Sequence, residues 1–254
     1  MILGSTRTNI TILSIFLLVA SICGLFYFKF TLLNIMITIL SFYVLNILGN
    51  WMTLHRYYSH KSFEFKHVYL KYLFTFLALL SGRGSVLGWT YIHRIHHAHS
   101  DTEIDPHSPV FLGFKLFGFS HYKKLEEENM KLFLVKDLMT TDQLFYHKYY
   151  FGLIVTFVII LGSINLSLLY FMWILPCLLV HISQNTFNYF GHIYGYRNHH
   201  TRDFSTNNVL LFPLILGECW HNNHHANPKN YTTKEKSNEL DPLGPFIKLV
   251  GYAK

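Results

Sequence analysis

The chain has 254 residues, of which 51% are hydrophobic, 17% are aromatic and only 14% are charged. Ordinary soluble domains are about a quarter charged, so this composition argues against a soluble protein of the usual kind. The formal net charge is +7. However, the basic residues form no stripe with interleaved aromatic side chains, which argues against nucleic-acid binding.

Charged residues are absent from three long stretches, which we expect to cross a membrane. No Asp, Glu, Lys or Arg occurs in residues 8–28, 30–55 or 149–196. About 20 apolar residues in a helix span the hydrocarbon core, so the first two stretches fit one helix each. The third fits two, with a turn near Asn165. The sequence therefore predicts one all-α integral membrane domain over residues 1–254, with four transmembrane helices near 9–28, 31–50, 149–164 and 167–189.

An even number of spans places both termini and the long segment 51–148 on one side of the membrane. All but one of the 21 Lys and Arg residues fall on that side, and only Lys29 falls on the other. Cationic loops stay in the cytoplasm, so we expect a helical cytosolic cap formed by 51–148 and 191–254. The apolar run 72–81 is too short to cross and is predicted to be a buried or interfacial helix.

Histidine is abundant, with 17 residues, and three groups of histidines follow the spans. The side chains of the first group, His55 and His60, would lie about 140° apart around a continuous helix. They can converge only if His60 lies beyond the end of the helix. The other two groups share the spacing His-x-x-His-His, which places all three side chains on one helical face and can direct them to one point. The groups are His55 and His60; His93, His96 and His97; and His221, His224 and His225.

Eight imidazoles are more than one metal ion needs, because a structural zinc site takes four ligands. We therefore expect two metal ions to share them. Neutral imidazole suits iron, zinc, copper and nickel, so the spacing does not name the metal. His181, deep in the fourth span, is either functional or part of a helix–helix hydrogen bond. Six other histidines are expected at the surface, namely His67, His99, His121, His147, His199 and His200.

These residues leave more than one class of function open. A metal transporter or sensor would place ionisable residues inside its spans. The predicted spans contain no Asp, Glu, Lys or Arg, which argues against transport. A purely structural metal cap, inert to O₂, also fits the histidine pattern.

The sequence around the three groups reads HRYYSHKSF, HRIHHAHSDTEIDPHSP and GECWHNNHHANP. Together with the four spans, these motifs resemble the membrane-bound fatty acyl desaturases, most closely their acyl-CoA Δ9 (stearoyl-CoA) branch. The resemblance extends from Thr31 to Gly251. It implies a His-ligated di-iron centre that uses O₂ as co-substrate to introduce a cis double bond, expected at Δ9, into a saturated long-chain acyl thioester. A membrane di-iron lipid hydroxylase is the nearest alternative.

The resemblance also implies two further residues at the metals, in the sequence NYFGHIYGYR. His192 would bind a metal directly and Asn188 would hold one through a water. Metal-bound histidines usually donate their other ring nitrogen to a carboxylate. The acidic residues next to the motifs are candidates for this role, with a solvated loop position as the alternative for each: Asp101, Glu103, Asp105 and Glu218.

The substrate and the electron donor are less defined by the sequence. Where the acyl-CoA branch often has an arginine for the CoA phosphates, this chain has Tyr91, although Lys123 and Lys124 offer a second basic contact. The family keeps its chain-length gauge on the second span, where counting back from the metal reaches Ile47 and Tyr43. The sequence contains no evident haem-binding segment, so we expect a separate donor of cytochrome b5 or ferredoxin type, and the basic cap favours an acidic one. The acyl carrier, the oligomeric state and the membrane, bacterial plasma membrane or endoplasmic reticulum, stay open.

Overall fold

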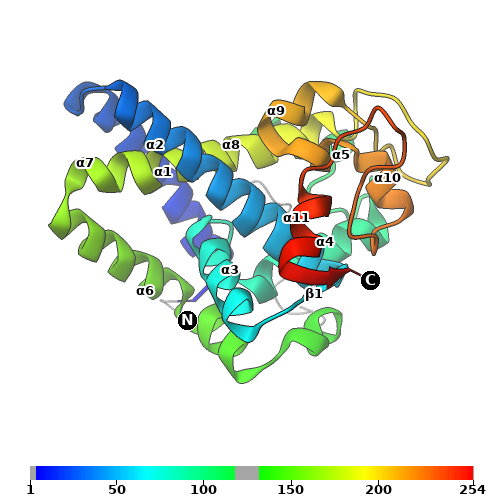
Figure 1. The fold of residues 1–254 in the computed structure, drawn as a ribbon, viewed down its shortest axis with the longest axis horizontal. Helices are drawn as coiled ribbons and strands as arrows, with labels where there is room; N and C mark the ends of the chain where they lie inside the picture. Colours follow the sequence, from blue (N-terminus) through cyan, green and yellow to red (C-terminus); the bar gives the residue numbers. More distant parts are fainter. Residues whose placement is uncertain (1–3, 118–131, 254) are drawn as a thin grey trace.

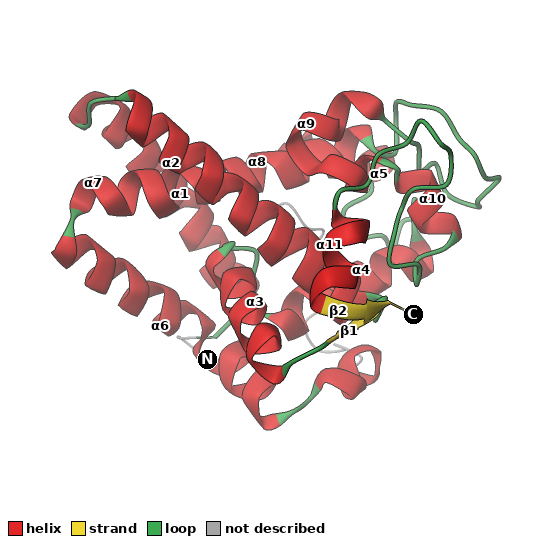
Figure 2. Ribbon diagram, viewed as in Figure 1, coloured by secondary structure: helices red, strands yellow, loops and turns green. Residues whose placement is uncertain are grey.

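The computed structural model describes residues 4–117 and 132–253, and this part of the chain is an all-α integral membrane fold (Figures 1 and 2). Four helices are long and apolar enough to cross a membrane, which confirms the four predicted spans. The second and fourth are continuous helices with a change of winding. The spans are α1 (Arg7–Tyr27), α2 (Leu32–Tyr43) with the π-helix η1 (Val44–Ser59), α6 (Thr141–Ile164), and α7 (Leu166–Leu169) with the π-helix η5 (Tyr170–Ile174) and α8 (Leu175–Phe190).

Two spans extend further than the charge-free stretches predict. The second continues to Ser59 instead of ending near residue 50, and the third begins at Thr141 instead of 149. Absence of charge marks only the part of a helix that lies in hydrocarbon. The extension of the second span carries Arg56, whose charge is satisfied by ion pairs with Glu218 and Asp241. The helix therefore projects from the membrane into the cap.

Polar side chains tie the second span to the fourth within an otherwise apolar bundle. Asn46 Nδ2 donates to Ser183 Oγ at 3.1 Å, and Asn50 Nδ2 donates to Gln184 Oε1 at 2.8 Å. Hydrogen bonds of this kind between membrane helices are worth about 0.6–2 kcal/mol each. They set the register between η1 and α8, the two helices whose ends reach the histidine groups.

The two short loops between spans lie at one end of the bundle. The ring of Phe28, after α1, stacks on Tyr170 of η5 at 4.9 Å, and Phe30 packs edge-on against Phe171 at 5.1 Å. Because η5 begins soon after the α6–α7 turn, that turn lies beside the α1–α2 loop. Both are at the left in Figure 1, away from α10 and α11.

The apolar run 72–81 forms most of α3 (Val68–Leu80), which is too short to span and lies against η1. One face is buried through Phe74 and Ala78, while Tyr72 and Phe76 on the other face stay exposed. A short helix with one exposed apolar face fits the membrane interface. The contact with η1 is close at Gly49, where an added Cβ would lie 2.6 Å from the Leu77 carbonyl oxygen.

The cap is built from short helices and connecting loops beyond the ends of the spans. An antiparallel pair, with Phe63 opposite Ala253, joins the segment after the first histidine group to the C-terminal end of the chain. The elements of the cap are β1 (Phe63–Phe65), α4 (Val86–His99), α5 (Pro109–Leu112), η2 (Gly113–Phe117), η4 (Leu132–Leu138), η6 (Val209–Leu211), α9 (Phe212–Ile215), η7 (Leu216–Cys219), α10 (His221–Ala226), α11 (Leu243–Val250) and β2 (Gly251–Ala253).

The topology predicts which positions share a side of the membrane. Cysteines introduced at Lys29 and Asn165 should react with an impermeant thiol reagent from one side, and cysteines at Thr102 and Lys236 from the opposite side. All four positions are exposed. Cys23→Ser gives a suitable background, because the other two native cysteines are buried. Reaction of the Thr102 and Lys236 variants from opposite sides would contradict the four-span arrangement.

Candidate metal centre

The first histidine pair comes from η1 and the residue that follows it. The backbone N–H of His60 donates to the carbonyl of His55 at 3.2 Å, which is an i→i+5 hydrogen bond. This π-helical winding differs from the usual i→i+4 pattern and brings residues five apart closer to one face. The two ring centroids consequently lie 4.8 Å apart. The prediction that His60 lies beyond the helix end is confirmed, because η1 ends at Ser59.

Helices α4 and α10 carry the two His-x-x-His-His groups, but neither group converges on one point as the spacing predicts. In each group the two histidines four residues apart belong to one cluster, and the histidine between them belongs to the other. Relative to residue i, position i+3 lies about 60° to one side and position i+4 about 40° to the other. A single short helix can therefore contribute to two adjacent sites.

Nine histidines form these two clusters, which we name by their composition. Within each cluster the candidate ligand nitrogens all lie within 4.8 Å of one another. His192, which follows α8, joins the second cluster, where the sequence resemblance expects it. The five-histidine site consists of His55, His60, His93, His97 and His224, and the four-histidine site consists of His96, His192, His221 and His225.

The Nε2 atoms face one another within each site. His60 Nε2 lies 2.7 Å from His93 Nε2, and His221 Nε2 lies 2.9 Å from His192 Nε2. Two such nitrogens can share only one proton, whereas a metal ion accepts both lone pairs. Within residues 4–117 and 132–253, the buried Nε2 of His225 has no hydrogen-bond partner, which costs about 1–3 kcal/mol unless the nitrogen binds an ion. This donor set fits transition metal ions.

Carboxylates contact the opposite ring nitrogen, Nδ1, of four of these histidines. Three are aspartates that accept hydrogen bonds of 2.8–2.9 Å from His96, His192 and His225. The fourth, Glu218, lies 3.0 Å from His55 Nδ1 as an ion-pair contact. Such partners fix the ring orientation and make the ligand more basic. Asp105 accepts from His96, Asp101 accepts from His192 and Asp203 accepts from His225.

The acidic residues expected beside the ligands divide into two groups. The structure brings Asp101, Asp105 and Glu218 to the histidines, whereas Glu103 is exposed, the arrangement of a solvated loop residue. Asp203 was not expected there. Its place in the loop after α8 follows no motif, and only its hydrogen bond to His225 reveals it.

The carboxylates beside the site favour the ionised form, and burial favours the uncharged form of several of its imidazoles. Burial alone would raise the pKa of Asp105, but the charge and hydrogen bond of His96 outweigh it and hold that pKa well below its usual range. Burial, followed by repulsion among neighbouring rings, lowers the pKa of His93 and His221 well below the usual value. Burial also lowers the pKa of His225 to about 4, although Asp203 opposes the shift. Neutral imidazole is the form that binds metals.

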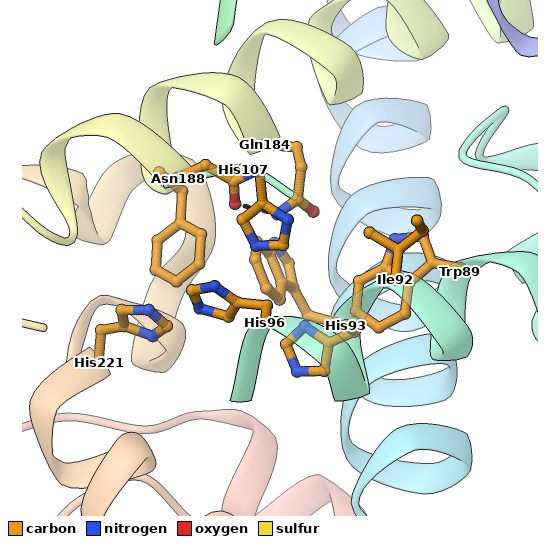
Figure 3. Close-up of a pocket in the computed structure, with 10 residues that line it drawn as sticks. Trp89, Ile92, His93, His96, His107, Gln184, Asn188 and His221 are labelled. Carbon is orange, nitrogen blue, oxygen red and sulfur yellow. Dashed lines mark hydrogen bonds between the residues drawn. The ribbon is translucent and has the colours of Figure 1, made fainter. Parts of the chain in front are cut away.

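A small cavity lies between the two sites and α8 (Figure 3). Its volume of about 20 Å³ is enough for one water molecule. His96 and His221 line it, and so does Asn188, whose Oδ1 accepts a hydrogen bond from Gln184 Nε2 at 2.9 Å. Asn188 therefore lies where an amide could hold a metal-bound water.

One buried histidine beside the site was missed by the sequence reasoning. His107 also lines the cavity, and its ring stacks on that of His96 with centroids 4.2 Å apart. Its backbone N–H donates to Asp105 Oδ1 at 3.0 Å. The signal was present, because His107 lies within the quoted motif two residues after Asp105.

Comparison with known proteins gives the same assignment as the motifs. The fatty acid desaturase family model matches residues 30–232. The chain belongs to the fatty acid desaturase family. It is 31% identical to the acyl-CoA 5-desaturase AL21 of Anemone leveillei over 82% of this chain and 66% of that protein. It is 32% identical to the Delta-9 acyl-lipid desaturase 2 of Arabidopsis thaliana over 78% and 66%, and 31% identical to the sn-1 stearoyl-lipid 9-desaturase of Anabaena variabilis over 87% and 84%. The chain thus spans slightly less than two thirds of the two plant proteins.

In this member of the family, the histidines outside the two sites have other surroundings. His67, His99 and His200 are exposed, as expected for surface residues. His147 is half-buried against Ser85 and His199 is half-buried against Glu235, while His121 lies outside the described residues. His181 on α8 lies 3.4 Å from Ser14 Oγ on α1, which agrees with the helix–helix hydrogen bond. It also lies within hydrogen-bonding distance of Arg83 and of the Gly82 carbonyl in the loop after α3.

The expected substrate contacts are only partly described. Tyr91 is buried on α4, and Lys123 and Lys124 lie outside the described residues. Ile47 is buried in the apolar cluster that joins the second span to α3 and to the cap, and Tyr43 packs against the same cluster. The Tyr43 hydroxyl donates to the Pro213 carbonyl at 2.5 Å.

Loss of one imidazole should weaken one site. We expect His97→Ala and His224→Ala to lower bound metal from two ions per chain towards one, and to lower activity by more than the 10–100-fold typical of losing an outer-shell partner. His200→Ala, at an exposed cap position, is the matched control. Metal analysis and turnover of detergent-purified protein measure both effects. Normal metal content and turnover in either variant would remove that histidine from the ligand set. Zinc bound in place of iron would not contradict the assignment, because imidazole binds both metals.

Proposed function

We propose that this protein is an O₂-dependent fatty acyl desaturase, an oxidoreductase that introduces a cis double bond at Δ9 into a saturated long-chain acyl thioester. Two iron ions would occupy the five-histidine and four-histidine sites. The observation that carries the proposal is the convergence of nine imidazoles into two adjacent sites where the spans enter the cap. The relatives of this chain include proteins named acyl-CoA 5-desaturase and Delta-9 acyl-lipid desaturase.

The chemistry explains why a metal pair is needed. Removing two hydrogens from adjacent methylenes of an unactivated chain requires an oxidant stronger than any side chain, and the bound irons with O₂ would supply it. In balance, one O₂, two electrons, two protons and the two substrate hydrogens give two waters and the double bond. The role of the protein is to hold the acyl chain at the metals and to exclude bulk water.

The residues of the site suit this role. Ionised aspartates keep the imidazoles oriented with Nε2 towards the metals, and Asn188 would hold a water in the cavity beside His96 and His221. Trp51, Trp89 and Phe187 line the same cavity. Their apolar rings would meet an acyl chain that approaches from the membrane.

The electron donor would be a separate protein of cytochrome b5 or ferredoxin type. Exposed basic residues, including Arg197, Arg202 and Lys236, lie on the cap loops around the third histidine group. Complementary charge accelerates association, so an acidic donor is favoured. We expect this face to be cytosolic, because cationic loops stay in the cytoplasm.

Expression in a desaturase-deficient host tests the function. Mass spectrometry of the fatty acids should show products two hydrogens lighter than their precursors, with the double bond at Δ9. The His224→Ala variant should give none, and the His200→Ala control should match the wild type. Products that gain one oxygen would identify a hydroxylase, and metal-loaded protein without any lipid product would favour a structural metal site. Separate analysis of the acyl-CoA and membrane-lipid pools identifies the carrier.

Substitutions in the second span should change the preferred chain length. Nine carbons cover about 11 Å at full extension, about the rise of eight α-helical residues, and eight residues before His55 is Ile47. The π-helical η1 rises less per residue than an α-helix, so Ile47 and Tyr43, four residues earlier, bracket this distance. Ile47→Trp should fill the end of the acyl site and favour shorter chains. Tyr43→Ala should open it and favour longer ones, whereas Tyr43→Phe keeps the ring and should retain the wild-type profile. Wild-type profiles in both Ile47→Trp and Tyr43→Ala would place the gauge elsewhere.

A further inference from the structure

The carboxylates around the two metal sites are unevenly distributed. The four-histidine site has three aspartates on its ring nitrogens, at His96, His192 and His225. In the described residues, the five-histidine site has one such contact, from Glu218 to His55. Two sites that draw ligands from the same helices therefore differ in their surrounding negative charge.

The three aspartates form one connected unit. Asp105 Oδ2 accepts a hydrogen bond from the backbone N–H of Asp101 at 2.8 Å as well as from His96. Asp101 Oδ2 in turn accepts from the backbone N–H of Phe204 at 2.8 Å. The loop after α4 is thereby joined to the loop that carries Asp203. Each carboxylate is held in place before any metal binds.

Asp203 is fixed by its own loop. Its Oδ1 accepts hydrogen bonds from Thr201 Oγ1 at 2.7 Å and from the backbone N–H of Ser205 at 3.0 Å. Its Oδ2 remains for His225 Nδ1, at 2.8 Å. With Nδ1 donating, the lone pair of His225 is on Nε2, the buried nitrogen that has no hydrogen-bond partner among the described residues.

Glu218 acts differently, because its charge is shared. Its Oε1 accepts from Arg56 Nε at 2.6 Å, and Arg56 also pairs with Asp241 at 2.8 Å. The guanidinium is shared between two carboxylates, so the group of Arg56, Glu218 and Asp241 carries a net charge of about −1, whereas three aspartates face the other site. The five-histidine site gains one more imidazole, but that ligand is neutral.

We propose that the four-histidine site is the higher-affinity metal site, filled first and emptied last, and that Asp203 is a positioning residue that sets this order through His225. The inference rests on the proposed function only in that two transition metals bind. Loss of an outer-shell carboxylate costs about 10–100-fold in metal affinity. Two more carboxylates on one site than on the other should therefore separate the two affinities by about 10²–10⁴-fold, against which the fifth imidazole acts.

Stepwise removal of metal from the purified, iron-loaded protein tests this order. The protein is equilibrated anaerobically with increasing concentrations of chelator, and the retained iron per chain is measured by elemental analysis. We expect two steps in the wild type. Asp203→Asn should move the tight step to 10–100-fold lower chelator concentration, and Asp101→Asn should do the same. Glu218→Gln should move only the weak step.

Two histidine variants assign the steps to the sites. His97→Ala should keep the tightly held iron, whereas His221→Ala should lose it. Asp142→Asn, a carboxylate at the start of α6 that contacts Thr140 and Lys71, is the control and should leave both steps unchanged. Gel-filtration profiles check that each variant is folded.

Several outcomes would overturn the proposal. A single step in the wild type would mean that the fifth imidazole cancels the effect of the carboxylates. Loss of the tight iron in His97→Ala rather than in His221→Ala would mean that the fifth imidazole outweighs them. An unchanged tight step in both Asp203→Asn and Asp101→Asn would remove the role of the aspartates. Protein that never holds iron or another transition metal would contradict the proposed function as well, which separates the two failures.

Discussion

Imidazoles can gather this closely only while most of them are uncharged, because several protonated rings at these separations would repel one another strongly in a buried site. Burial enforces this condition by lowering the pKa of histidines such as His93 and His224 far below the usual value. In the uncharged rings, Nε2 atoms of neighbouring histidines face each other across 2.7–3.1 Å. Two bound cations would resolve this conflict, since each accepts several lone pairs at once. The rest of the fold holds these rings in that arrangement.

The membrane bundle supplies the rigid frame for this centre. The second span does not end at the membrane surface but projects into the cap, where its π-helical winding brings His55 and His60 together. Polar contacts such as Asn50 with Gln184 fix that helix against α8, whose end leads to His192. Helices α4 and α10 then complete both sites. A helix that serves two sites couples them mechanically, which would suit the proposed reaction at a pair of metals.

The sequence predicted much of this arrangement, and its failures have physical causes. Charge-free stretches identified the four spans, because hydrocarbon excludes charge, and the spacing of the histidine groups predicted eight of the nine histidines that the structure gathers into two clusters. The spacing also predicted one point of convergence for each His-x-x-His-His group. That was wrong because positions i+3 and i+4 diverge by about 100°, enough to serve two ions. The contact of Asp203 with His225 could not be predicted, because it depends on how the loop after α8 folds back. His107 lay inside a recognisable motif, but its burial beside His96 depends on the turn around Asp105.

We propose that nine imidazoles bind two metal ions at the end of the spans that enters the cap. X-ray absorption at the iron edge of the purified protein, combined with elemental analysis, tests it most directly. The account predicts two irons per chain, a first shell of nitrogen and oxygen atoms, and the multiple scattering of several imidazoles on each iron. One iron per chain, or a shell dominated by sulfur or carboxylate oxygen, would contradict it.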